Sequence, residues 1–136
     1  MATQDTIGAM IEAKNMTAPR ITPADIQAAV LQAHYFTAWQ GAQLAYWADS
    51  DPAAPKPVEG EPDRTGPLST LTFCVLELQN GFTVTGESAC ASPENFDAEI
   101  GRKIARKNAE EKIWPLLGYA LKVDLHRRVK FDASPK

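Results

Sequence analysis

The dipeptide Asn80-Gly81 constrains the fold of this chain more than any other pair of residues. It separates two strand-like runs, and nothing else stands between them. Both residues accept a positive φ, which a two-residue type I′ turn requires. We therefore predict a β-hairpin with Asn80-Gly81 at its tip, in which Gln79 pairs with Phe82.

That register assigns every hairpin side chain to one face of the sheet, because side chains alternate along a strand. One face is mostly apolar and is predicted to pack against a helix; it carries Phe73, Val75, Phe82 and Val84. The other face is half apolar and half polar; it carries Thr72, Cys74, Leu76 and Leu78 opposite Ala89, Glu87, Thr85 and Thr83. We interpret this second face as a partly covered sheet face, or else as a partner interface or ligand floor.

A long helical pattern follows the hairpin. Ser92 is a good N-cap and Pro93 suits the first helical position, so the helix is predicted to begin there and to run to Trp114. Phe96, Ile100 and Ile104 recur every four residues along this helix. Beside them runs a narrow packing stripe of small side chains, formed by Gly101, Ala105 and Ala109 and followed by Ile113. The glycine within this stripe is expected to let the helix approach a neighbouring element closely.

The rest of the chain gives weaker signals. Residues 1–20 are predicted to form a flexible N-terminal arm, either frayed or a short helix. Thr22 and Pro23 predict the start of a helix through Ile26, Val30 and Ala33. The aromatic segment at 34–39 fits either a short strand or a continuation of that helix, and residues 40–48 indicate a further helix.

Two segments interrupt this pattern. Residues 49–67 contain five prolines and are predicted to form a long loop. Beyond Pro115 the apolar spacing fits either a helix or a strand; we favour a short helix through about Leu121, followed by a solvated basic tail at 126–130. The expected fold class is α+β: a small antiparallel sheet packed by one long C-terminal helix and by N-terminal helices.

Length and composition narrow the class of protein. The chain has 136 residues, 44% of them hydrophobic, so we expect one domain over residues 21–136. The net charge of −3 disfavours a general nucleic-acid coat. In the predicted register Cys74 and Cys90 point to opposite faces, which opposes a disulfide unless a bulge at Gly86 changes the phase of the strand. We find no signal-peptide core and no apolar run of the ~20 residues that a membrane span needs, so we expect a cytoplasmic protein.

No group of residues predicts a reaction. His34 and His126 lack metal-ligand spacing, and Cys74 has no evident base nearby. We therefore expect a protein that is not an enzyme and that has no cofactor and no metal.

Binding is the better-supported expectation. The loop before the long helix leads to free helix amides, which attract anions. Hydroxyl, amide and guanidinium groups could converge there on a small phosphorylated ligand, with an aromatic ring stacked on its base. The candidate ligand-binding residues are Phe82, Thr83, Thr85, Ser92, Asn95, Arg102, Arg106 and Tyr119. Taken one at a time, each of these has a plainer interpretation as a helix cap or a solvated side chain.

The segment LTFCVLELQNGFTVTGESACASPENFDAEIGRKIARKNAEEKIWPLLGY, residues 71–119, resembles the phage gene-49/gene-66 family of small tailed-phage and prophage accessory proteins. ITPADI at 21–26 and HYFTA at 34–38 are also similar to that family. Leu117 departs from the pattern, which has an acid at this place. The resemblance implies a phage-encoded accessory protein that acts in the host cytoplasm.

Two functions are compatible with these observations. The first is a homo-oligomeric binder that sequesters a small phosphorylated signal of the cyclic-nucleotide class without catalysis; phage anti-defence proteins that act as sponges share the strand-then-helix layout. The second is an interaction module that docks a host or phage protein through its sheet face. A sheet face exposed in this way is often covered by a copy of itself.

Overall fold

The structure is a computed structural model of the chain and describes residues 4–14, 18–48 and 60–132. In chain order it contains α1 (Gln4–Ala13), α2 (Pro23–Ala29), β1 (Val30–Thr37), α3 (Ala38–Trp47), the 3₁₀ turn η1 (Pro67–Thr70), β2 (Leu71–Leu78), β3 (Thr83–Ala89), the 3₁₀ turn η2 (Pro93–Asn95), α4 (Ala98–Glu111) and α5 (Ile113–Asp132). The predicted α+β class is confirmed. Part of the predicted Pro-rich loop, residues 49–59, lies outside the described residues.

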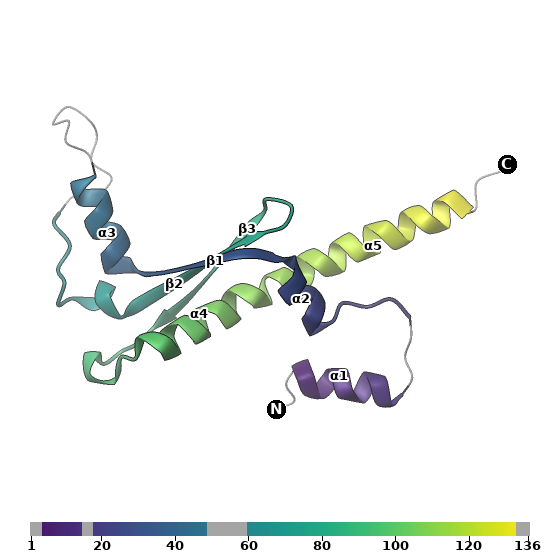
Figure 1. Ribbon diagram of the computed structural model, residues 1–136, viewed down its shortest axis with the longest axis horizontal. Helices are drawn as coiled ribbons and strands as arrows, with labels where there is room; N and C mark the ends of the chain where they lie inside the picture. The colour runs from purple at the N-terminus through teal and green to yellow at the C-terminus, as the bar shows by residue number, and fades with distance from the viewer. Residues whose placement is uncertain (1–3, 15–17, 49–59, 133–136) are drawn as a thin grey trace.

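The three strands form one antiparallel sheet in the order β1-β2-β3. Helix α4 lies across one face of this sheet, and α5 continues in nearly the same direction beyond it (Figure 1). The core lies between β2, β3 and α4, with Ile26 of α2 closing one side; its other buried apolar residues are Cys74, Leu76, Leu78, Val84, Ala105, Ala109 and Ile113. None of the helices in the described part of the chain combines the length and the hydropathy needed to cross a membrane.

The hairpin forms where it was predicted, but its register is shifted by one residue. The Leu78 amide donates to the Phe82 carbonyl at 2.8 Å, and the Gly81 amide donates to the Leu78 carbonyl at 2.9 Å. The loop therefore has three residues, and Gly81 has a φ of 88° at its end. The Asn80 side chain accepts from the Phe82 amide at 3.0 Å and stabilises this longer loop.

A shift of one residue changes which side chains of β3 share a face of the sheet with a given side chain of β2. The predicted composition of the two faces was therefore wrong. The side of β2 that α4 covers carries Thr72, Cys74, Leu76 and Leu78, all of them buried. Val84 is buried with them as predicted, whereas Phe82 is 53% exposed. Cys90 continues β3 in the phase of Gly86, so it lies on the same side as Cys74 and not on the opposite one. Both cysteines are free thiols.

The helices also differ from the predictions at their ends. Thr22 caps α2 in a capping box with Asp25, as its sequence indicated, but α2 ends at Ala29 and the chain passes directly into β1. Val30 and Ala33 are therefore strand residues. Among the alternatives left open, residues 4–13 form a helix, the segment His34–Thr37 lies in a strand, and Trp39 lies in α3.

The long helix does not begin at Ser92. Ser92 precedes only η2, its side chain makes no capping bond, and Phe96 then adopts an extended conformation. The helix starts again at Ala98, where the Asp97 side chain accepts from the Ile100 amide at 3.1 Å. One residue in a turn conformation, Lys112, separates α4 from α5. The helix is interrupted here because Pro115 has no amide hydrogen to donate to the carbonyl of Glu111, four residues earlier. Helix α5 then runs to Asp132, so the prediction of a short helix that ends near Leu121 was also wrong.

The small stripe of α4 lies very close to the sheet. A Cβ placed on Gly86 of β3 would lie 2.2 Å from the Ala105 carbonyl oxygen and 2.3 Å from the Ala109 nitrogen. A Cβ on Gly101 would lie 2.9 Å from the Thr72 hydroxyl. The expected close approach at Gly101 is thus confirmed, and Gly86 allows a still closer one.

Candidate functional site

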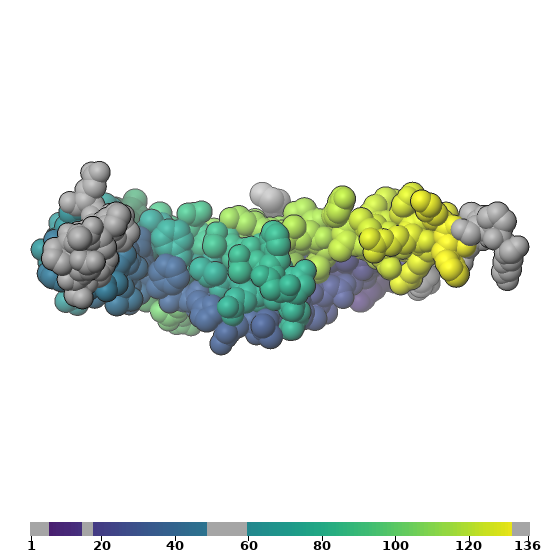
Figure 2. Space-filling view, turned by 90° about the horizontal axis from the view of Figure 1, so that it is seen from above, coloured from purple at the N-terminus to yellow at the C-terminus, as the bar shows by residue number. Residues whose placement is uncertain are grey.

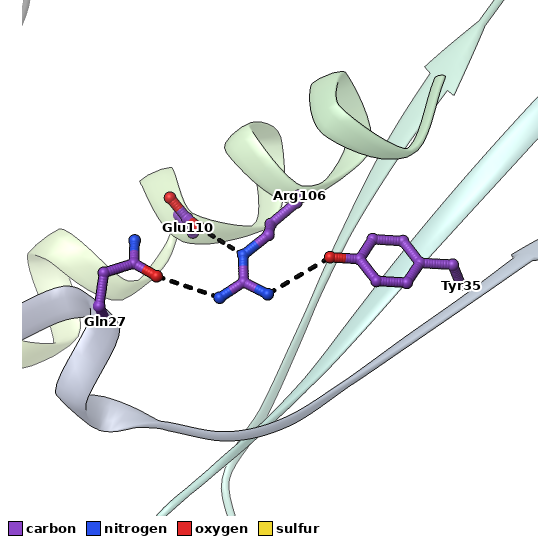
Figure 3. A network of polar contacts seen from close by, with 4 residues as sticks. All are labelled: Gln27, Tyr35, Arg106 and Glu110. Carbon is purple, nitrogen blue, oxygen red and sulfur yellow. Dashed lines mark hydrogen bonds and ion pairs between the residues drawn. The ribbon is translucent and has the colours of Figure 1, made fainter. Parts of the chain in front are cut away.

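Arg106 is the centre of a polar cluster where α2, β1 and α4 meet (Figure 3). Its Nε donates to Glu110 Oε1 at 2.7 Å, its Nη1 to the Tyr35 hydroxyl at 3.3 Å, and its Nη2 to Gln27 Oε1 at 3.0 Å. Gln27 and Tyr35 come from the consecutive elements α2 and β1, and they lie 79 and 71 residues before Arg106 in the sequence. The cluster is therefore made by the tertiary fold.

Local structure fixes each member of the cluster. The capping box at Thr22 sets the start of α2 and so the position of Gln27. Tyr35 pairs with Cys74 of the central strand, which directs its side chain to the side of the sheet that α4 covers. Glu110 lies one helical turn after Arg106, the spacing at which a cation and an acid on a helix interact.

The guanidinium keeps its charge and remains partly accessible. Hydrogen bonding to Tyr35, and then to Glu110, raises the pKa of Arg106. The Arg106 side chain is 32% exposed and that of Glu110 is 22% exposed. A guanidinium has five N–H donors, and the three bonds occupy one donor on each of its nitrogens. One donor on Nη1 and one on Nη2 are left for a ligand.

The chemistry of this cluster suits binding. A guanidinium can hold a phosphate or carboxylate in a bidentate way, and a carboxylate accepts from hydroxyl or amino groups. Because Glu110 balances the charge of Arg106, a ligand that offers both acceptors and donors fits better than a bare anion. In the described residues, no group of three histidine, cysteine or acidic side chains has the arrangement of a metal site.

The eight candidate residues from the sequence do not form one site in a single chain. Arg102 and Arg106 lie one turn apart on α4. Thr83 and Thr85 are exposed on the side of the sheet that α4 leaves open. The others are spread over three further places: Phe82 beside the hairpin loop, Ser92 and Asn95 at η2, and Tyr119, 75% exposed, on α5.

Sequence reasoning identified Arg106 but missed the residues that hold it. The i,i+4 spacing of Arg106 and Glu110 was visible in the sequence and predicts a pair. Tyr35 lies in a segment whose sequence fits either a strand or a helix. Gln27 gives no sequence signal, since only the packing of α2 beside α4 brings it to the guanidinium.

A second surface is the face of the sheet that α4 leaves open. The rings of Phe36 and Phe73 lie 5.7 Å apart on this face, and His34 Nε2 lies 3.3 Å from Glu77 Oε2. Helix α3 contacts β1 and β2 at one end of the sheet (Figure 1). This open sheet face, formed by His34, Phe36, Phe73, Val75, Glu77, Thr83 and Thr85, thus combines aromatic, aliphatic and polar groups.

Comparisons with known proteins give the chain a family. No curated protein and no solved structure matches it. Residues 21–125 match the phage protein (N4 Gp49/phage Sf6 gene 66) family, a span that includes α2, the whole sheet, α4 and the first part of α5. Since the match takes in most of the chain and all of the Arg106 cluster, this chain belongs to the phage protein (N4 Gp49/phage Sf6 gene 66) family.

Proposed function

We propose that this phage protein binds and sequesters a small phosphorylated signal of the cyclic-nucleotide class in the host cytoplasm, without converting it, and so acts against host defence. The observation that carries the proposal is the Arg106 cluster, in which a fixed guanidinium with two remaining donors lies beside a carboxylate. A nucleotide matches both groups, because its phosphate accepts hydrogen bonds and its ribose hydroxyls and base amino groups donate them.

Neighbouring residues extend this match. Arg102 is exposed one turn before Arg106 and offers a second cation for a second phosphate. Tyr35 is 37% exposed beside the guanidinium, and its ring offers a surface for a base. Binding without turnover is supported by the engagement of both charged groups: the arginine stays protonated, and the Glu110 carboxylate accepts from its Nε at 2.7 Å.

The proposal is tested by calorimetric titration of the full chain with cyclic di- and trinucleotides and cyclic ADP-ribose isomers. One of these ligands should bind, and it should be recovered unchanged from the heated complex by chromatography. Arg106→Gln should weaken its binding by about 10- to 150-fold, the equivalent of one charge-assisted hydrogen bond of about 1.5–3 kcal/mol.

Lys103→Gln is the matched control. Lys103 lies on the same helix but forms an exposed pair with Glu99 at 3.2 Å, away from the cluster, so its replacement should leave the affinity unchanged. No binding heat with any ligand of the panel would contradict the proposal. So would recovery of a chemically altered ligand.

The open sheet face favours a second function, docking of a host or phage protein. Its Phe36–Phe73 ring pair and Val75 supply apolar area, and the His34–Glu77 pair and the β3 threonines supply a polar rim. A photocrosslinker at position 75 should then capture one protein in infected cells, and Thr85→Arg should abolish that capture. A photocrosslinker at position 103 is the control and should capture nothing. If the Thr85→Arg chain also lost nucleotide binding in the calorimetric titration, that result would argue against two separate surfaces.

A further inference from the structure

One row of residues runs along the whole length of α4 and α5, with one member every four positions. It consists of Gly101, Ala105, Ala109, Ile113, Leu117, Leu121, Leu125 and Val129. Residues four apart lie on neighbouring turns of a helix and form a ridge that can pack against another element. We call this row the four-residue ridge.

The two halves of the four-residue ridge have different surroundings. The first half is buried against the sheet, and Ile113 has no exposed surface. Leu117 packs at the margin of the core. The second half extends past the sheet, where Leu121 and Leu125 are half-buried and Val129 is 68% exposed. The main neighbours of α5 among the described elements are α2 and the end of α4.

Helix α5 therefore projects from the domain with large aliphatic side chains along one side. At 1.5 Å per residue, its 20 residues span about 30 Å. Figure 2 shows this helix (yellow-green to yellow) extending beyond the strands. A shallow groove with a volume of ≈ 590 Å³ opens along this part of α5, and Leu125 and Val129 are among its lining residues.

The chain as a whole exposes more area than a compact monomer of its mass. The chain exposes 10230 Å². A compact monomer of 14.8 kDa exposes about 7000 Å², so the excess is about 3200 Å². A stable interface between two proteins buries about 1200–2000 Å² in total, which this excess can supply.

We propose that the end of α5 pairs with α5 of a second copy of this chain, through Leu121, Leu125 and Val129. The four-residue ridge is the same in both copies, so a twofold axis near Leu125 brings like ridges together, as an isologous interface requires. The two helices run antiparallel, because a parallel pair would set the basic segment 126–130 against itself.

Sedimentation equilibrium of the full chain tests the pairing. The wild-type chain should have twice the 14.8 kDa mass of one chain. Leu125→Glu should raise the dissociation constant at least about 100-fold, because it places a charge in the apolar contact, while the helical circular dichroism stays unchanged. Ala120→Glu introduces the same charge on another side of α5 and should leave the dimer intact.

A wild-type chain that remains monomeric at about 100 µM would overturn the proposal. So would a Leu125→Glu chain that associates as strongly as the wild type, since another surface would then hold the copies together. These outcomes do not depend on any nucleotide, so they are independent of the titrations above.

The direction of the pair has its own test, in a Cys90→Ser background. When Leu121→Cys and Val129→Cys chains are mixed and oxidised, the antiparallel pair should give mixed disulfide dimers, and each variant alone should give few. The reverse result would overturn the antiparallel arrangement.

Discussion

Helices α4 and α5 share one repeat and one direction, yet they are used differently. On α4 the repeat is made of glycine and alanine, which lets the helix approach Gly86 of β3 at backbone distance. On α5 it begins with Ile113 in the core and continues with leucine and valine, and from Leu121 onward these side chains extend past the sheet. Small residues allow close contact with a preformed surface, whereas large residues provide apolar area for a surface still to be covered.

The same contrast applies to two arginines on α4. Arg106 is held by three side chains from three elements, whereas Arg102 is an exposed side chain one turn away. Equal charge at similar positions therefore does not give an equal role. The neighbours that the fold brings to each residue decide it.

Gly86→Ala tests the α4 side of the comparison with the largest expected effect. Its Cβ would collide with the backbone of Ala105 and Ala109, so the helix must move away and the core must loosen. We expect a loss of about 4 kcal/mol in the free energy of unfolding, measured by urea denaturation. Gly118→Ala on α5 is the control: nothing lies within 4 Å of its Cβ, and it should stabilise the chain by up to about 1 kcal/mol. Equal stability of the two variants would show that α4 does not lie so close to β3.

Ile113→Ala and Leu125→Ala compare two members of the same ridge. Ile113 is fully buried, so its truncation should cost about 3 kcal/mol of unfolding free energy through lost burial and a cavity. Leu125→Ala should cost less than about 1 kcal/mol when measured at submicromolar concentration, where the chains are separate. Similar losses in both variants would mean that α5 is packed within its own chain.

Arg106→Gln and Arg102→Gln compare the two arginines in the absence of ligand. The first removes three hydrogen bonds in a partly buried cluster, so we expect a loss of about 1–2 kcal/mol in unfolding free energy. The second changes an exposed side chain and should stay within about 0.5 kcal/mol of the wild type. Thermal unfolding followed by circular dichroism measures both losses. Equal losses in the two variants would mean that the fold does not hold Arg106 more firmly than Arg102.

The smallest effect is a pH dependence reported by Cys74, beneath α4. Burial raises the pKa of the Cys74 thiol, so the folded chain keeps this proton to a higher pH than the unfolded chain does. Stability should be constant below the ordinary thiol pKa and should decline as pH rises from there through the raised pKa. Urea midpoints across the alkaline range should show this decline in the wild type and in Cys90→Ala, and Cys74→Ala should lack it. A decline that persists unchanged in Cys74→Ala would assign it to other groups.

Several features of the fold follow from the sequence alone. Asn80-Gly81 located the hairpin, Thr22 with Pro23 located the start of α2, and the small residues of α4 predicted a close contact. The letters of residues 71–119 also gave the family. These signals are local, because the conformational preferences and hydrogen bonds that produce them lie within a few residues of one another.

Other features needed the tertiary structure. The hairpin loop has three residues and not two, and Gly81 can adopt the conformation that either loop requires. The face that becomes buried is the one that α4 can approach. The Arg106 cluster required Gln27 and Tyr35, which a repacked α2 and β1 could have placed elsewhere. Sequence thus determined where the hairpin and α2 lie and which residues can come close. Packing decided which face, register and partner each residue has, because those depend on contacts between segments that no local preference specifies.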